Sequence, residues 1–146
     1  MRTITIKQIK FRNILNSNGD RAIEVEMKSN NEITGIASAA SAIISGKREK
    51  KELRTLDNKY IDDLINEIYC TNFLNQKQFD DILKKYINNV GTSICLTLSL
   101  SFARITAQEQ KILLMDYITK LKEYTNKQTM QKQMWLSTLL LLKSNK

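Results

Sequence analysis

Apolar and polar residues alternate along much of the first forty positions of the chain. Residues Ile4–Phe11 (ITIKQIKF) have the period of a half-buried strand, and residues Ala22–Met27 (AIEVEM) repeat it. In the second segment, alternate positions divide into an apolar face with Ile23, Val25 and Met27 and an acidic face with Glu24 and Glu26. Both segments are therefore predicted to be strands with one face on the core.

Two polar turns and a third strand complete this pattern. Residues Asn16–Asp20 (NSNGD) contain Asn and Gly, which tolerate positive φ, and Ser29–Glu32 (SNNE) form a second polar break. Residues Ile33–Ala40 (ITGIASAA) are predicted to form a strand that packs closely through its small side chains. The N-terminal part is thus predicted to be a three-stranded antiparallel meander.

Beyond Gly46 the apolar period becomes that of a helix. Three stripes have this spacing: Ile61, Leu64, Ile65 and Ile68; Phe79, Ile82, Leu83 and Tyr86; and Ile112, Met115, Ile118 and Leu121. Asn75 is placed to cap the second helix. The expected fold class is α+β, a meander followed by a helical bundle, with a further helix at the C-terminus.

The segment Ile94–Ala103 (ICLTLSLSFA) fits two structures. Its strict alternation is typical of a strand. It also fits a helix buried on nearly all sides, because Ser and Thr can return their hydroxyl hydrogen bonds to the preceding helical turn. Periodicity alone leaves both open.

The composition is that of a globular chain with a basic surplus. Of 146 residues, 42% are hydrophobic, and the formal net charge is +8. Such a charge fits a merely solvated surface, or contact with nucleic acid or an acidic protein face. Aromatic residues make up 7% and are not interleaved with the basic ones, and no RNP-like, KH-like or zinc-finger signature occurs.

Histidine is absent, which removes the commonest general base and zinc ligand. Cys70 and Cys95 are too far apart for a CxxC site, and both are expected to be small core residues with reduced thiols. The start lacks the apolar core of a signal peptide, and the apolar run Met134–Leu142 is shorter than the roughly 20 residues that span a bilayer. We therefore expect a cytoplasmic protein without a membrane span.

Five motifs follow one another along the chain: RNILNSNGDRAIEVEM (Arg12–Met27), SGKREKKELR (Ser45–Arg54), QKQFDDIL (Gln76–Leu83), VGTSICLTLSLSFA (Val90–Ala103) and ILLMDYITKL (Ile112–Leu121). In this order they resemble the motifs of the N-terminal domain of enolase. The first is similar to the family's R-x-I-L-D-S-R-G-N-P-T-V-E-V-E-V hairpin. The resemblance covers roughly residues 3 to 121 and implies a buried helix at Ile94–Ala103.

The resemblance also implies what this domain lacks. In enolase the domain caps an α/β barrel that carries the catalytic acid and base, the magnesium carboxylates and most substrate contacts. Its loop serine, which binds a second magnesium, falls on Ile44, although a shifted alignment brings Ser41 or Ser45 there. The family's arginine that forms an ion pair across the enolase dimer is Asn18. With the barrel outside the 146 residues, we expect a pseudoenzyme without catalytic, cofactor or metal sites.

Two groups of residues near these motifs are candidates for contacts. Glu24 and Glu26 are either a working pair of carboxylates or an exposed strand face. Ala40, Ile43 and Ile44 are expected to have become packing or contact residues. A basic cluster lies at the predicted start of the next helix, where the helix dipole disfavours positive charge; it comprises Lys47, Arg48, Lys50 and Lys51. The cluster is either a solvated surface without a function or a contact for acidic partners.

The last part of the chain does not resemble the family. We expect an enolase-like domain over residues 1–125 and an apolar, basic helical tail over 126–146. The tail's candidate contact residues are Met130, Met134, Trp135, Leu139 and Leu142. It either folds back onto the domain or docks into a partner.

These features favour a non-catalytic structural or protein-interaction subunit. We expect it to dock through the tail and through the surface that faces the barrel in enolase. A basic nucleic-acid-associated protein and a cap or regulatory subunit of an enolase-type enzyme are the alternatives, and a homo-oligomer is compatible with each.

Overall fold

The computed structural model describes residues 3–40 and 59–123. The chain divides into two compact units, Met1–Lys111 and Ile112–Lys146. In the second unit, residues 114–123 are helical, as the third apolar stripe predicts. The predicted boundary after residue 125 lies outside the described residues and stays a prediction.

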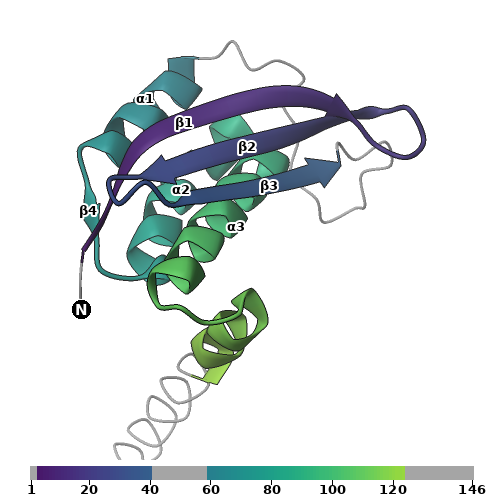
Figure 1. Ribbon diagram of the computed structural model, residues 1–146. Helices are drawn as coiled ribbons and strands as arrows, with labels where there is room; N and C mark the ends of the chain where they lie inside the picture. Colours follow the sequence, from purple (N-terminus) through teal and green to yellow (C-terminus); the bar gives the residue numbers. More distant parts are fainter. Residues whose placement is uncertain (1–2, 41–58, 124–146) are drawn as a thin grey trace, which may run out of the picture. The chain divides into compact units, whose positions relative to one another are not determined.

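The first unit contains the predicted antiparallel meander. Its strands are β1 (Ile4–Leu15), β2 (Arg21–Ser29) and β3 (Thr34–Ala40). A fourth strand, the two-residue β4 (Asn72–Phe73), pairs antiparallel with the start of β1, so the sheet order is β3-β2-β1-β4 (Figure 1). The α+β prediction is confirmed, with β4 as an addition that the sequence pattern did not indicate.

The two faces of β2 are divided as the alternation predicts. Val25 and Met27 are fully buried, whereas Glu24 and Glu26 are partly exposed on the opposite face. Val25 lies between Phe11 of β1 and Ala37 of β3 in the strand register. The buried face of the sheet is thus lined by alternate residues from all three strands.

The turn between β1 and β2 is held by the side chain of Asn16. Its Oδ1 accepts hydrogen bonds from the backbone N–H groups of Asn18 and Asp20, both at 2.9 Å. Gly19 has φ of +81°, a conformation that L side chains rarely adopt. The residues predicted to form the turn therefore do so: Asn16 accepts backbone hydrogen bonds within the turn, and Gly19 provides its positive φ.

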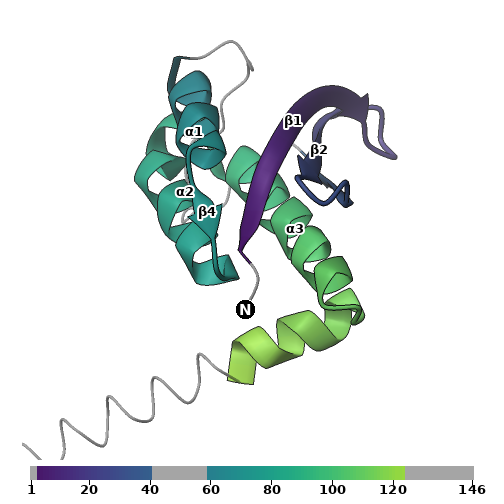
Figure 2. The ribbon, with the colours of Figure 1, turned by 60° about the vertical axis from the view of Figure 1, so that its left-hand side comes forward.

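Three helices follow in the first unit. They are α1 (Lys59–Tyr69), α2 (Gln76–Val90) and α3 (Thr92–Glu109). They gather on one side of the sheet, where α3 contacts β2 and β3, and α1 contacts β1 (Figure 2). The ambiguous segment Ile94–Ala103 lies within α3, so it is the helix that the family resemblance implies.

The hydroxyl groups of α3 explain how an alternating sequence forms a buried helix. Thr97 Oγ1 donates to the backbone of its own preceding turn, at 2.9 Å from the carbonyl oxygens of both Ser93 and Ile94. Ser101 Oγ donates instead to the sheet, 3.2 Å from the carbonyl oxygen of Val25. Because these hydroxyls are satisfied, polar residues can occupy fully buried positions on the helix.

Asn75 caps α2, as predicted. Its side-chain Oδ1 accepts a hydrogen bond from the backbone N–H of Gln78 at 3.0 Å. The side chain of Gln78 accepts in turn from the backbone N–H of Leu74 at 2.8 Å. These two bonds satisfy donors on both sides of the helix start and fix where α2 begins.

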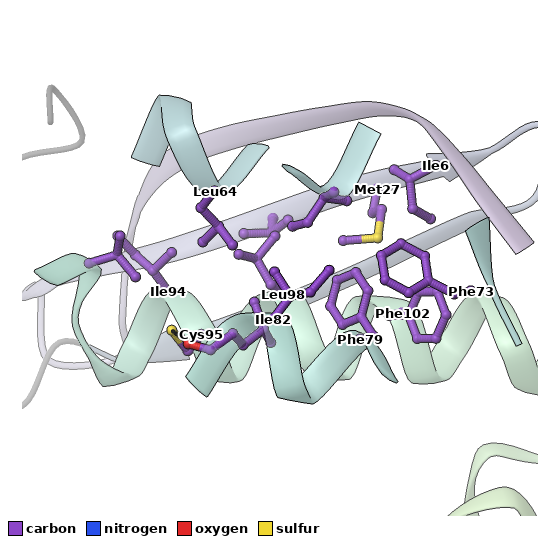
Figure 3. Packing of buried hydrophobic residues seen from close by; sticks show 14 of the residues in the cluster. Ile6, Met27, Leu64, Phe73, Phe79, Ile82, Ile94, Cys95, Leu98 and Phe102 are labelled. Atoms are coloured by element: carbon purple, nitrogen blue, oxygen red, sulfur yellow. Dashed lines mark hydrogen bonds between the residues drawn. The ribbon is translucent and has the colours of Figure 1, made fainter. Parts of the chain in front are cut away.

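The core is organised around three phenylalanine rings. Phe73, Phe79 and Phe102 come from β4, α2 and α3, and all are fully buried (Figure 3). Phe79 and Phe102 stack with centroids 4.3 Å apart. Phe73 forms a T-shaped pair with each of them, with centroid distances of 5.0 Å to Phe79 and 5.3 Å to Phe102. Aliphatic residues from the sheet and α1, including Met27 and Leu64, extend the same cluster.

Gly35 of β3 allows α3 to approach the sheet closely. A Cβ atom at this position would lie 2.2 Å from the backbone oxygen of Ser101 and 3.0 Å from Cγ1 of Ile105. Only glycine fits this contact, so the small-residue sequence of the third strand serves helix packing, as predicted.

The two cysteines differ in environment, which corrects one prediction. Cys95 is buried in the core, and burial raises the pKa of its thiol to about 11. Cys70, however, is exposed immediately after α1. The apolar residues beside Cys70 in sequence led to the wrong expectation, because the helix ends there and turns the side chain outward.

Candidate functional site

The side chains proposed from the sequence as partner contacts lie outside the described residues. These are Ile43, Ile44, Lys47, Arg48, Lys50, Lys51, Met130, Met134, Trp135, Leu139 and Leu142. They stay predictions. The described candidate is the acidic pair of β2, Glu24 and Glu26.

Arg12 of β1 lies between the two carboxylates of this pair. Its Nη1 donates a hydrogen bond to Glu24 Oε1 at 2.9 Å, and its Nη2 donates to Glu26 Oε2. Lys10 Nζ is 3.9 Å from the other oxygen of Glu26. We call these four residues, Lys10, Arg12, Glu24 and Glu26, the meander ion network.

Strand register produces this network. Arg12 pairs with Glu24, and Lys10 pairs with Glu26, so all four side chains point to the sheet face away from the core. Opposite charges directly across an antiparallel pair stabilise the pairing modestly. The hydrogen bonds to Glu24 and then Glu26 raise the pKa of the Arg12 guanidinium above its usual value.

Chemically, the meander ion network is a cross-strand ion cluster. Each carboxylate of the pair already accepts a charge-assisted hydrogen bond from a guanidinium that remains protonated at any ordinary pH. The geometry therefore favours the exposed-face interpretation of the pair over a working acid and base.

Comparison with known proteins agrees with this architecture. Residues 6–118 match the family model described as enolase, N-terminal domain. The chain belongs to the enolase N-terminal domain family. It is 32% identical over 136 residues to the enolases of Ehrlichia chaffeensis and Ehrlichia canis, covering 81% of this chain and 32% of each relative.

A more distant relative has a similar extent of match. Enolase 2 of Methanospirillum hungatei is 28% identical over 130 residues, which cover 77% of this chain and 30% of that protein. The chain thus spans about a third of the length of the curated enolases it matches.

The turn of the enolase-like hairpin presents no charge at the position of the family's arginine. Asn18 is exposed at the tip, and its backbone N–H is bound to Asn16 Oδ1. Leu15, at the end of β1, is 69% exposed beside it. An amide cannot form an ion pair, so the contact implied for the enolase dimer lacks its charged partner here.

A second cluster, at the β2–β3 turn, was not predicted from the sequence. Glu32 has φ of 63° and accepts hydrogen bonds from Lys28 and from Lys7, the latter at 2.7 Å. These bonds, led by that from Lys28, lower the pKa of Glu32 to about 2. Next to it, Asn31 Nδ2 donates to Glu109 Oε1 of α3 at 2.6 Å, which ties the turn to the helix.

A third cluster joins α1 to α2. Lys85 Nζ is 2.5 Å from Glu67 Oε1, and the Tyr86 hydroxyl donates to Glu67 Oε2 at 2.9 Å. The bond from Lys85 lowers the pKa of Glu67, and the same carboxylate raises the pKa of Tyr86. Its parts come from two helices, so only the fold brings them together.

A partly buried polar cluster links α2 to α3. Gln76 Nε2 donates to Asp80 Oδ1 at 3.0 Å and to the backbone oxygen of Ser99 at 3.1 Å, while Ser99 Oγ donates to Asp80 Oδ1 at 2.7 Å. Gln76 Oε1 is buried and has no hydrogen-bond partner in the part of the chain that the structure describes. The i, i+4 spacing of Gln76 and Asp80 was the available signal for this pair.

The described residues contain neither a metal-binding cluster nor a membrane-spanning helix. Within residues 3–40 and 59–123, no group of three or more His, Cys, Asp or Glu lies together in a way that could hold a metal ion. None of the helices there is long and apolar enough to cross a membrane.

Proposed function

We propose that this enolase N-terminal domain works as a non-catalytic structural or protein-interaction subunit. The observation that carries the proposal is the meander ion network, in which Arg12 engages both Glu24 and Glu26. A general base has to reach a proton on its substrate, whereas these carboxylates are directed to the guanidinium. The network therefore supports a scaffold role for this face.

The resemblance to enolase supports the same proposal. In that family the acid, the base and the magnesium carboxylates belong to the barrel. The loop serine that adds a magnesium contact falls on Ile44, and a shifted alignment that brings Ser41 or Ser45 there would still lack the partner carboxylates. An isoleucine side chain has no oxygen with which to bind a hard cation. Since Ile44 lies outside the described residues, this support comes from the sequence alone.

The proposed contact surface includes residues 126–146 and the positions Ile43 and Ile44. Aromatic residues and Met are enriched where protein interfaces are fully buried. The segment supplies Met130, Met134 and Trp135 in close succession, followed by Leu139 and Leu142. This composition supports docking to a protein partner.

The catalytic part of the proposal is tested by an activity assay. The purified full chain, supplied with magnesium and 2-phosphoglycerate, is expected to give no dehydration above the rate without protein. An active enolase at the same molar concentration is the positive control. Turnover by the full chain would overturn the proposal.

The interaction part is tested by affinity purification from the native source. The wild-type full chain is compared with two variants. The double variant Trp135→Ser, Leu139→Ser alters the tail, and the control Leu15→Ser removes one exposed leucine from the hairpin. We expect a defined partner to be retained by the wild type and by L15S and lost by the double variant. Equal recovery with all three proteins would contradict docking through the tail.

An acidic partner is a second candidate, supported by the distribution of charge. The described residues carry 13 Lys and Arg against 12 Asp and Glu, a net charge of +1 out of +8 for the chain. The basic surplus therefore belongs to residues 1–2, 41–58 and 124–146, including Lys47, Arg48, Lys50 and Lys51. Nucleic-acid binding through them should weaken steeply as salt rises, whereas apolar docking should not.

A cap or regulatory role on an enolase-type enzyme is supported by the family match over residues 6–118. The uncharged Asn18 counts against it, because the enolase pairing then lacks one of its ions. Co-purification of a barrel-containing enolase in the experiment above would favour this role over an unrelated partner.

A further inference from the structure

Among the residues that the structure describes, β3 is an edge strand of the sheet. It stands at one end of the order β3-β2-β1-β4, and no described residue forms a strand on its outer side (Figure 1). Its pairing with β2 runs without a bulge from Lys28 opposite Thr34 to Ala22 opposite Ala40. A straight, regular strand with an unpaired edge is a template for another strand.

The opposite edge of the sheet is protected, which makes β3 distinctive. There, β4 pairs with Ile4 and Thr5 of β1. The pairing of β1 with β2 then shifts register between Ile6 and Gln8, which is a bulge in β1. Beyond this bulge, the backbone N–H of Ile9 donates to the Tyr69 hydroxyl of α1 at 2.9 Å. A short cap strand, a bulge and a covering helix are devices that block pairing at an edge.

The chemistry of β3 offers no comparable protection. Its residues, TGIASAA, include no charged side chain and no Pro. On the outward face, Ile36 is 41% exposed and Ser38 is also exposed. On the inward face, Gly35 and Ala37 are buried, and Gly35 lies close against the backbone of Ser101 in α3.

We infer that β3 pairs with β3 of a second copy of this chain, in antiparallel orientation about a two-fold axis. Centred on Ala37, this pairing sets Ile36 opposite Ser38 and Gly35 opposite Ala39 on each side of the axis. The two four-stranded sheets then form one continuous sheet of eight strands. The inference goes beyond the proposed function and does not depend on it.

A second copy fits this edge because the strand is complementary to itself. Two-fold pairing brings no like charges opposite one another, since β3 has none. On the inward face, the pairing sets Gly35 opposite Ala39, so only small side chains meet there. An interface between identical surfaces is also the commonest way in which identical chains associate.

The test measures the mass of the full chain in solution by sedimentation over a range of protein concentration. We expect twice the chain mass of 16.9 kDa at high concentration. The variants Ser38→Lys and Ile36→Lys place a charge on the edge strand and are expected to weaken the dimer by about tenfold or more, which is at least about 1.4 kcal/mol. Leu15→Lys adds the same charge at the hairpin end and is expected to leave the dimer unchanged.

Circular dichroism and thermal unfolding verify that each of the three lysine variants keeps the fold, which we expect because all three sites are exposed. Hydrogen exchange provides an independent measurement on the unaltered chain. Amides of β3 are expected to exchange more slowly at dimer-forming concentrations than in dilute solution, while those of β2 do not change. A wild type that stays monomeric, with β3 amides already protected by another part of the chain, would overturn the inference. So would a dimer that L15K dissociates and that S38K and I36K leave intact.

Discussion

The close contact between β3 and α3 predicts a specific cost for a single methyl group. In Gly35→Ala the new Cβ would lie 2.2 Å from the backbone oxygen of Ser101, whereas ordinary contacts of this kind begin at 3.4 Å. The strand and the helix would have to separate by about 1.2 Å at this point, or the helix would have to shift along the strand. Because the obstacle is backbone, no change of rotamer relieves it.

The magnitude follows from two opposing effects. Overfilling a packed core generally costs about 1–3 kcal/mol. Replacing Gly by Ala also restricts the unfolded chain, which returns about 0.4–1 kcal/mol. The difference between the two effects runs from about 0 to about 2.6 kcal/mol. We expect G35A to lower the free energy of unfolding by an amount in the upper half of that range, because the nearest obstacle is backbone and Ile105 is also only 3.0 Å away.

The assay is urea unfolding of the full chain, followed by circular dichroism. Two controls separate the causes. Gly19→Ala changes a glycine with φ of +81° and open space around it, so its cost is backbone strain without a clash. Ile105→Ala in the G35A background should recover little, because the clash with the Ser101 backbone remains. Stability of G35A within about 0.5 kcal/mol of wild type would refute the packing argument.

Three further predictions concern a helix cap, a carboxylate and the thiols. Asn75→Ala should lower the free energy of unfolding in urea by about 1 kcal/mol, because it removes the cap of α2. Asn88→Ala, at an exposed position within the same helix, should lower it much less. Equal effects of the two variants would mean that the cap does not contribute to stability. Because the pKa of Glu32 is lowered to about 2 in the folded protein, its contribution to stability is present above its ordinary value of 4.5 and is lost as the pH falls towards 2. The stability difference between wild type and Glu32→Gln should therefore shrink between pH 5 and pH 2, and a difference independent of pH would contradict this account. A thiol reagent should label exposed Cys70 rapidly and buried Cys95 only on unfolding, as peptide mass mapping can verify; equal rates in the native protein would contradict the assigned burial.

The sequence was sufficient to predict the structure of a segment where that structure depends on local chemistry alone. The alternation at Val25 and Met27 identified the buried face of β2, because side chains of a strand point to opposite sides in turn. Asn75 was recognisable as a cap because its side chain satisfies amides that any helix start leaves free. Both signals are local, and tertiary contacts did not override them.

The helix α3 could not be identified from its pattern, for a physical reason. It is buried on most sides, so it has no polar face to set a helical period, and its Thr97 and Ser101 bond to oxygens that only the folded structure brings near. The family resemblance supplied what periodicity could not. Strand β4 was likewise invisible, because two residues carry no period and pair only where β1 begins.

The candidate site was predictable only in part. The shared face of Glu24 and Glu26 followed from their spacing, but the partner that engages both, Arg12, is set by the register of a neighbouring strand. The cluster of Glu67, Lys85 and Tyr86 depends on how two helices pack. Such groupings need the tertiary structure, because nothing in the sequence relates residues so far apart.

The phenylalanine cluster has a practical consequence for anyone who alters this protein. Only Leu74 and Asn75 separate β4 from α2, and the rings of Phe73 and Phe79 meet edge to face across that short connection. Extra residues inserted there would pull apart two rings that also touch Phe102, so this link should tolerate no lengthening. A fluorescent label or purification tag is better placed at the exposed Ser17 or Asn18. These residues belong to the β1–β2 turn, which lies at the end of β1 away from β4 (Figure 1).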